Sequence, residues 1–150
     1  MDNDKYGIRA SGDYVTYEGR DYFASLLRDE VRIFSDDEPL PPGFAPSRYN
    51  WIEGECFVPL SDIEHLRRVR TTCSWRGHRF EVRIIVGDMA NLVYLGRDFD
   101  EVSGLPGMRR PDKFEVRGKA PVAELTDVEE HAEDVLFDGR TSGTRDGQTR

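Results

Sequence analysis

The sequence has little of what metal sites, disulfide frameworks and membrane spans require. It contains two cysteines and three histidines in 150 residues, and no run of 18 apolar residues that could form a transmembrane helix. The spacing of Cys56, His65, Cys73 and His78 matches no common zinc site. Residues 1–10 are polar and lack the apolar segment of a signal peptide. We therefore expect a cytoplasmic protein without metal or cofactor, in which both thiols are buried and reduced.

The motifs of the common enzyme classes are also missing. The chain has no GxSxG, Walker A, GxGxxG, HExxH or CxxC sequence, and the acidic run at residues 36–38 lacks the residue order of a calcium loop. Two carboxylate pairs, Asp98 with Asp100 and Glu53 with Glu55, could supply a general acid and base. Because a third of the residues are charged, such pairs also arise by chance. We expect no enzymatic activity and keep a carboxylate-based hydrolase as an alternative.

The balance of charge disfavours nucleic acid as a ligand. The formal net charge is −8, and residues 138–150 carry three Arg and two Asp, so residues 1–137 carry −9. Phosphate recognition requires a clustered basic face. An acidic surface suits a basic protein partner, although it also serves solubility alone.

The most informative feature present is an internal repeat, in which residues 14–69 are echoed by residues 72–134. The matching blocks, in the same order in both copies, are residues 17–20 with 75–78, residues 40–44 with 105–108, and residues 60–64 with 125–129. The offset is 58 residues in the first block and 65 in the other two. Self-similarity of this kind indicates a duplicated structural unit.

Each copy reads as a short β unit closed by a helix. Apolar residues alternate with polar ones on both sides of Gly19 and Gly77, which predicts two strands joined by a glycine turn. A third strand, an acidic loop and a fourth strand follow. Ser61-x-x-Glu64 and Thr126-x-x-Glu129 have the pattern of a capping box, which predicts a short helix after each. Alternation also places six residues on one sheet face: Cys73, Trp75, Phe80, Val82, Ile84 and Val86. We expect the first four of them to be buried.

These units define a mainly β (α+β) fold of duplicated, SH3-like antiparallel units. Copies of about 60 residues are marginal alone, so we expect them to share a core as one pseudo-symmetric domain over residues 13–137. Residues 1–12 lack periodicity, and no apolar residue follows Phe137. We expect disorder over residues 1–12 and 138–150.

The two acidic loops, residues 35–48 and 96–112, are the predicted partner-binding site. Each carries three acids near its start and an apolar residue after a glycine turn, a combination in which charge steers encounter and the apolar residue anchors the complex. In the alternative, Leu40, Leu105 and both anchors fold back over the sheet. The predicted partner-binding residues are Asp36, Asp37, Glu38, Phe44, Asp98, Phe99, Asp100, Glu101 and Met108.

Several segments resemble small actinobacterial proteins of the immunity-protein type, which accompany polymorphic or secreted toxins. These segments are YVTYEGRDYFAS at 14–25, PGF at 42–44, VPLSDI at 58–63, VRTTCSWRG at 69–77 and ELTDV at 124–128. The resemblance spans residues 14–131. It implies a cytoplasmic antitoxin, without chemistry of its own, that covers the active site of a toxin domain. The sequence does not determine the oligomeric state, and we expect a monomer when the protein is unbound. It does not identify the toxin, which could be a nuclease, an NAD-consuming enzyme or another effector.

A second hypothesis needs no toxin. An SH3-like peptide-binding or scaffold module would line a groove with aromatic residues such as Tyr17, Trp51 and Trp75.

Overall fold

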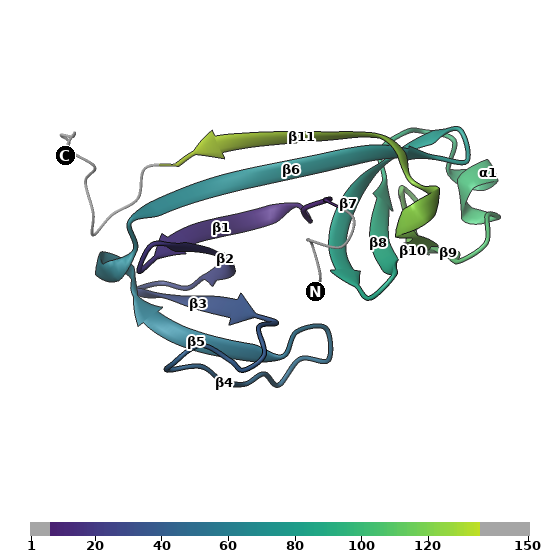
Figure 1. Cartoon of the computed structure of the whole chain (residues 1–150). Coiled ribbons are helices and arrows are strands. Elements are labelled where there is room, and N and C mark those ends of the chain that lie inside the picture. Colours follow the sequence, from purple (N-terminus) through teal and green to yellow (C-terminus); the bar gives the residue numbers. More distant parts are fainter. Residues whose placement is uncertain (1–6, 136–150) are drawn as a thin grey trace. The chain divides into compact units, whose positions relative to one another are not determined.

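The computed structural model describes residues 7–135 and divides into two compact units (Figure 1). The first unit comprises Gly12–Val69 with residues 132–135, and the second comprises residues 7–11 with Arg70–His131. The strands hydrogen-bond in the order β4-β5-β3-β2-β1-β6-β7-β8-β10-β9, and β11 pairs with β6. This antiparallel sheet of 11 strands confirms the mainly β prediction.

The first unit is a ladder of five strands and one very short strand. Its sheet buries one face, because Val15, Val31, Ile33 and Val58 alternate with residues that point the other way. Its elements are β1 (Gly12–Tyr17), β2 (Arg20–Leu26), β3 (Glu30–Ser35), β4 (Ala45–Pro46), β5 (Gly54–Pro59), a 3-10 turn η1 (Leu60–Asp62) and the first half of β6 (His65–Trp75). Residues 65–69 of β6 pair with β1, and residues 72–75 pair with β7 of the second unit.

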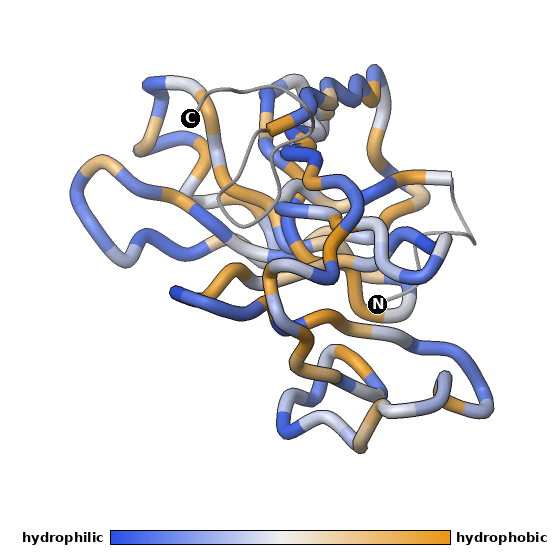
Figure 2. The backbone as a smooth tube through the Cα atoms, turned by 90° about the vertical axis from the view of Figure 1, so that its left-hand side faces the viewer, coloured by the Kyte–Doolittle hydropathy of each residue, from blue (hydrophilic) through white to orange (hydrophobic). Residues whose placement is uncertain are grey.

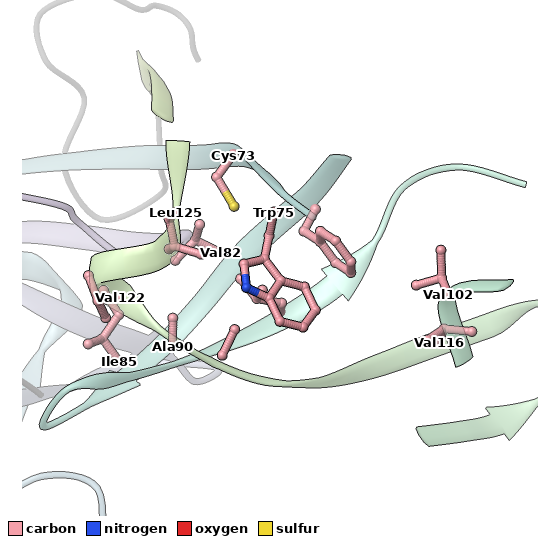
Figure 3. Close-up of a cluster of buried hydrophobic side chains, with 12 residues drawn as sticks. Cys73, Trp75, Val82, Ile85, Ala90, Val102, Val116, Val122 and Leu125 are labelled. Carbon is pink, nitrogen blue, oxygen red and sulfur yellow. The ribbon is translucent and has the colours of Figure 1, made fainter. Parts of the chain in front are cut away.

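The second unit has its own hydrophobic cluster, shown in Figure 3. The Trp75 ring lies within this cluster against Phe80, at 5.7 Å between ring centroids, and its indole Nε1 donates a hydrogen bond of 2.9 Å to Glu124. The elements after β6 are β7 (His78–Val86), β8 (Met89–Tyr94), helix α1 (Phe99–Ser103), β9 (Met108–Asp112), β10 (Glu115–Pro121), a 3-10 turn η2 (Val122–Glu124) and β11 (Thr126–Asp134). The predicted burial of Cys73, Trp75, Phe80 and Val82 is confirmed. The predicted face does not continue to Val86, because the β7–β8 register shifts between Val82 and Ile85, so that Ile85 is buried and Val86 is 42% exposed.

Both predicted hairpin turns are present. Glu18 and Gly19 connect β1 to β2 with φ of 50° and 80°, and Arg76 and Gly77 connect β6 to β7 with φ of 51° and 81°. Two successive residues with positive φ are typical of the type I′ turn, whose twist matches that of paired strands. Hydrophobic and hydrophilic segments follow one another along the backbone (Figure 2).

The predicted capping boxes are wrong. Ser61 lies inside η1, whose N-cap residue is Pro59, and Thr126 begins β11 after η2, whose N-cap residue is Pro121. Neither 3-10 turn has a side-chain cap hydrogen bond. Each turn is only three residues long and leads directly into a strand, so no α-helix follows either motif.

The ordered fold also begins earlier than predicted. Ala10 and Ser11 are buried, Ser11 donates its backbone N–H to the Val82 carbonyl at 2.8 Å, and its hydroxyl accepts the Thr71 backbone N–H at 2.8 Å. These contacts come from distant residues, which local periodicity does not reveal. The predicted tail over residues 138–150 lies outside the described residues.

Candidate functional site

The outer face of the first unit, opposite its core, carries aromatic residues where strand alternation leads one to expect polar ones. Tyr14 on β1, Phe23 on β2 and Phe34 on β3 are direct neighbours in the register of the sheet. In the next row Arg32 lies opposite Phe57 of β5. Tyr49 and Trp51, from the segment between β4 and β5, pack onto these strands. We call Tyr14, Phe23, Phe34, Tyr49, Trp51 and Phe57 the aromatic face.

Ring contacts join every member of the aromatic face except Phe57. Trp51 lies 5.0 Å from Phe34 and 5.9 Å from Phe23 between ring centroids, and it stacks on Tyr49 at 5.6 Å. Edge-to-face and offset contacts of this kind add about 0.5–1.5 kcal/mol each beyond the area they bury. Phe23 in turn packs over Gly12, where a Cβ atom would lie 2.5 Å from the Phe23 ring. The segment that contains Trp51 is therefore fixed to the sheet by rings.

An ion-pair network around the buried Glu55 carboxylate also holds this segment. The Arg32 guanidinium donates a hydrogen bond of 2.6 Å to the Tyr49 hydroxyl and lies 5.5 Å from the Tyr49 ring centroid and 5.3 Å from that of Phe57. Glu55, which is buried, accepts hydrogen bonds from the Ser47 hydroxyl at 2.9 Å and the Arg48 backbone N–H at 3.2 Å. Its carboxylate also lies 4.0 Å from Arg32 and 3.6 Å from Arg48.

The network keeps Glu55 ionised. Burial by itself raises the pKa of Glu55, but the Ser47 hydroxyl, the Arg48 backbone N–H and the two guanidinium groups outweigh it and lower the pKa below the ordinary value. A carboxylate held charged by two hydrogen-bond donors and two nearby guanidinium groups is a poor proton carrier at neutral pH. The geometry thus gives no support to Glu53 and Glu55 as an acid–base pair.

The outer rim of the aromatic face is open to solvent. Tyr49 is 37% exposed and Phe57 is 44% exposed, whereas Tyr14 and Phe34 are buried. Tyrosine, tryptophan and arginine are the residues that most often dominate protein–protein interfaces, because they bury a large area and lose little conformational entropy when already held in place. The arrangement is suited to binding rather than to covalent chemistry.

The predicted site residues of the first loop are engaged within their own unit. Asp36 accepts the Glu53 backbone N–H at 2.9 Å, and Asp37 pairs with Arg20 at 2.6 Å. Glu38 is exposed. Phe44 is half-buried against the core cluster, with its ring 5.4 Å from that of Tyr22. Phe44 therefore folds back onto the sheet, as in the alternative prediction, and is not an exposed anchor.

The second loop is organised in the same manner. Asp100 pairs with Arg110 at 2.5 Å, and Glu101 lies 2.6 Å from Nε2 of His78. Asp98 precedes helix α1 without a side-chain cap hydrogen bond. The apolar residues Phe99 and Met108 pack, half-buried, against the cluster of the second unit. The role of both sets of residues in partner binding stays a prediction.

Other predicted residues do not form a common site. Trp75 is buried in the second unit, and Tyr17 packs against the core of the first, so neither lines a groove with Trp51. Cys73 is buried, and burial raises the pKa of its thiol to about 11. Cys56 is only half-buried, which corrects the prediction that both thiols are buried. The neighbouring strand β4 is two residues long and leaves β5 partly uncovered.

Two further observations concern residues 7–135. No helix there is long and apolar enough to cross a membrane. Nor does this part of the chain bring three or more His, Cys, Asp or Glu side chains together in a group that could hold a metal ion.

Sequence reasoning passed over Phe23, Arg32, Phe34 and Phe57 as functional candidates. The signal was available: these four residues occupy the non-core positions of β2, β3 and β5, where a solvated face normally carries polar side chains. Arg32, which lies among aromatic residues on that face, indicated that the face is not simply solvated. No protein-family model, no curated protein and no solved structure matches the chain.

Replacing Glu55 with glutamine should lower the free energy of unfolding by about 2 kcal/mol at pH 7, because charge-assisted hydrogen bonds are lost. A lowered folded-state pKa adds stability that is present above the unfolded pKa, ordinarily 4.5, and is lost as pH falls through the folded value. The gap between wild type and Glu55→Gln should therefore narrow as pH drops below about 4.5. Urea unfolding at several pH values measures this.

Glu53→Gln provides the matched control, since Glu53 is exposed and two positions away. Its substitution should change stability by no more than about 0.5 kcal/mol. A pH-independent gap for Glu55→Gln would show that the carboxylate is not stabilised in its charged form.

Proposed function

We propose that the protein is a non-catalytic binding protein that uses the aromatic face of its first unit to dock on another protein. The observation that carries the proposal is the exposed rim of Tyr49 and Phe57, fixed around Arg32 by stacking and by the buried Glu55 network. Because these rings are already ordered, little conformational entropy is lost when a partner covers them.

The specific class that we propose is an immunity protein, which neutralises a cognate bacterial toxin by covering its active site. The resemblance of residues 14–131 to proteins of that type supports it, as does the acidic charge, which would steer a basic toxin domain toward the chain. In this proposal the acidic loops assist encounter, and the aromatic face supplies the buried contact.

We also propose that the two units arose by duplication of an SH3-like unit. Each has a hairpin with a glycine turn, a third strand, a pair of further strands, a proline-capped 3-10 turn and a last strand. In this scheme Pro59 and Pro121, which are 62 residues apart, are equivalent positions. Ser61 and Thr126 are then not equivalent. Superposition of experimental coordinates of the two units tests it.

The binding proposal is tested by affinity capture from a bacterial host lysate with three forms of the full chain. Wild type is compared with Tyr49→Ala/Phe57→Ala and with the control Leu26→Ala/Leu27→Ala, which removes two equally exposed apolar side chains from the same unit. A protein retained by wild type and by the control, but lost with the aromatic-face variant, supports docking there. Equal retention by all three forms would overturn it. Circular dichroism verifies that each variant is folded.

The immunity proposal has a separate outcome. When the captured protein is expressed alone it should arrest growth, and co-expression of wild type, but not of Tyr49→Ala/Phe57→Ala, should restore it. A captured partner that is harmless when expressed would exclude the toxin reading while leaving the binding face in place.

A further inference from the structure

The hairpin of β9 and β10 in the second unit is basic, although the chain as a whole is acidic. Residues 108–119 contain five cations, Arg109, Arg110, Lys113, Arg117 and Lys119, and two carboxylates, Asp112 and Glu115. Their net charge is 5 − 2 = +3, so the rest of the chain carries −8 − 3 = −11. The hairpin therefore carries a net positive charge within an acidic chain.

Like charges lie directly opposite each other within this hairpin. Arg109 of β9 is the register partner of Arg117 of β10, and Lys119 follows Arg117 on the same face of β10. Opposed residues on neighbouring strands lie about 5 Å apart, and alternate residues of a strand about 6.6 Å apart. Three cations thus occupy adjacent positions of one sheet face. Like charges in direct opposition destabilise a sheet.

The carboxylates of this face neutralise only part of it. Glu115 pairs with Arg117, and Glu81 of β7 pairs with Arg83 at 3.5 Å. No ion pair to Arg109 or Lys119 is present within residues 7–135. Next to them the face continues with Val93 and Asn91 of β8, which are the register partners of Arg117 and Lys119. The surface offers free cations beside an apolar and an amide side chain.

We infer that this face, formed by Arg109, Arg117, Lys119, Asn91 and Val93, binds an acidic segment of a partner protein. Arginine forks match carboxylate geometry. Glu115 already pairs with Arg117, so a ligand carboxylate placed between Arg109 and Arg117 relieves the repulsion that remains at Arg109. Val93 supplies contact for an apolar side chain of the segment. The face lies in the second unit and uses no residue of the aromatic face, so it is independent of the proposed function.

An acidic peptide fits this face better than a nucleic acid. A polynucleotide extends its negative charge well beyond three cations, and the −11 carried by the rest of the chain opposes it. A short acidic segment places a few carboxylates at the cations and carries no further negative charge beyond them. Since charges are screened over about 8 Å at physiological salt, the local cations dominate its binding.

The experiment uses a fluorescein-labelled 12-residue peptide of alternating Glu and Val, with the full chain and fluorescence anisotropy at low salt. Two comparison probes are the same peptide with Gln in place of Glu, and single-stranded oligothymidylate. Wild type should bind the Glu peptide at least about tenfold more tightly than the Gln peptide, since charged hydrogen bonds are the stronger ones. Arg109→Gln/Lys119→Gln should lose that preference. Arg28→Gln/Arg70→Gln, which removes two exposed cations elsewhere, should keep it.

A second readout separates binding from a structural role. Removal of the like-charge opposition should leave the melting temperature of Arg109→Gln/Lys119→Gln equal to or above that of wild type, because these cations serve a ligand and not the fold. A lower melting temperature would overturn the inference. So would unchanged Glu-peptide binding by this variant, no preference of wild type for the Glu peptide, or tighter binding of oligothymidylate.

Discussion

Replacing Phe80 with alanine should lower the free energy of unfolding by about 4 kcal/mol, the largest loss that we expect from one side chain of this protein. Phe80 is fully buried, lies opposite Cys73 in the register of β6 and β7, and contacts the rings of Trp75 and Tyr94 at 5.7 and 5.6 Å. Alanine would leave a cavity that rigid neighbouring strands cannot fill. Guanidinium unfolding measures the loss.

Phe114→Ala is the matched control for this prediction. It removes the same ring from the same unit, but Phe114 is 70% exposed. The expected change is about 0.5 kcal/mol or less, as for other surface substitutions. Similar losses for both variants would mean that Phe80 does not lie in a packed core.

The two tryptophans allow the same experiment to test how far the units unfold together. Trp51 reports on the first unit and Trp75 on the second, so Trp75→Phe and Trp51→Phe each leave one reporter. We expect both reporters to follow one transition, and Phe80→Ala to shift both, because β6 contributes residues to both units. If Phe80→Ala shifts only the Trp75 signal, the single-domain prediction is wrong.

Local sequence patterns were sufficient to predict the hairpins and the buried face of the second unit as far as Val82. The positive φ values at Gly19 and Gly77 are those that a two-residue hairpin demands, and alternation predicted the burial of Cys73 and Phe80. The same rules failed after Pro59 and Pro121. A capping box satisfies amide donors only where a helix follows, and here a strand follows a three-residue turn.

The candidate site was harder to predict because its residues are brought together by register. Arg32 and Tyr49 are 17 residues apart, and neither resembles a functional motif in the sequence; their contact depends on the return of the chain between β4 and β5. The acidic loops, in contrast, were evident in the sequence, but some of their carboxylates are engaged in ion pairs. Asp37 and Asp100 find arginine partners that lie on other elements.

In this protein the composition of the non-core sheet face is therefore a more useful signal of a candidate site than the acidic loops are. In the first unit that face carries Phe23, Phe34 and Phe57, and in the second Arg109, Arg117 and Lys119 occupy such positions. Both sets depart from the mixture of charges expected of a solvated sheet. Aromatic residues favour a buried contact, whereas cations favour an acidic ligand, so the two units would serve different partners or different parts of one partner.

The close approach of β9 to β10, which places Arg109 opposite Arg117, depends on a glycine. At Gly118 a Cβ atom would overlap the Gly107 carbonyl oxygen and would lie 2.8 Å from the Met108 Cα. These are backbone atoms that cannot rotate away. Gly118→Ala should therefore push the two strands apart and lower the free energy of unfolding by about 3 kcal/mol, a typical cost of severe overpacking.

Gly104→Ala is the control for this substitution, since Gly104 has helical φ and ψ and its nearest atom to a Cβ is the Glu101 carbonyl oxygen at 3.5 Å. Alanine there should be neutral or stabilise by about 0.5 kcal/mol, because the unfolded chain loses freedom. Guanidinium unfolding followed by Trp75 fluorescence compares the two variants. If Gly118→Ala is as stable as Gly104→Ala, the two backbones are not in contact. The register that sets Arg109 against Arg117, and with it the cationic face, would then be wrong.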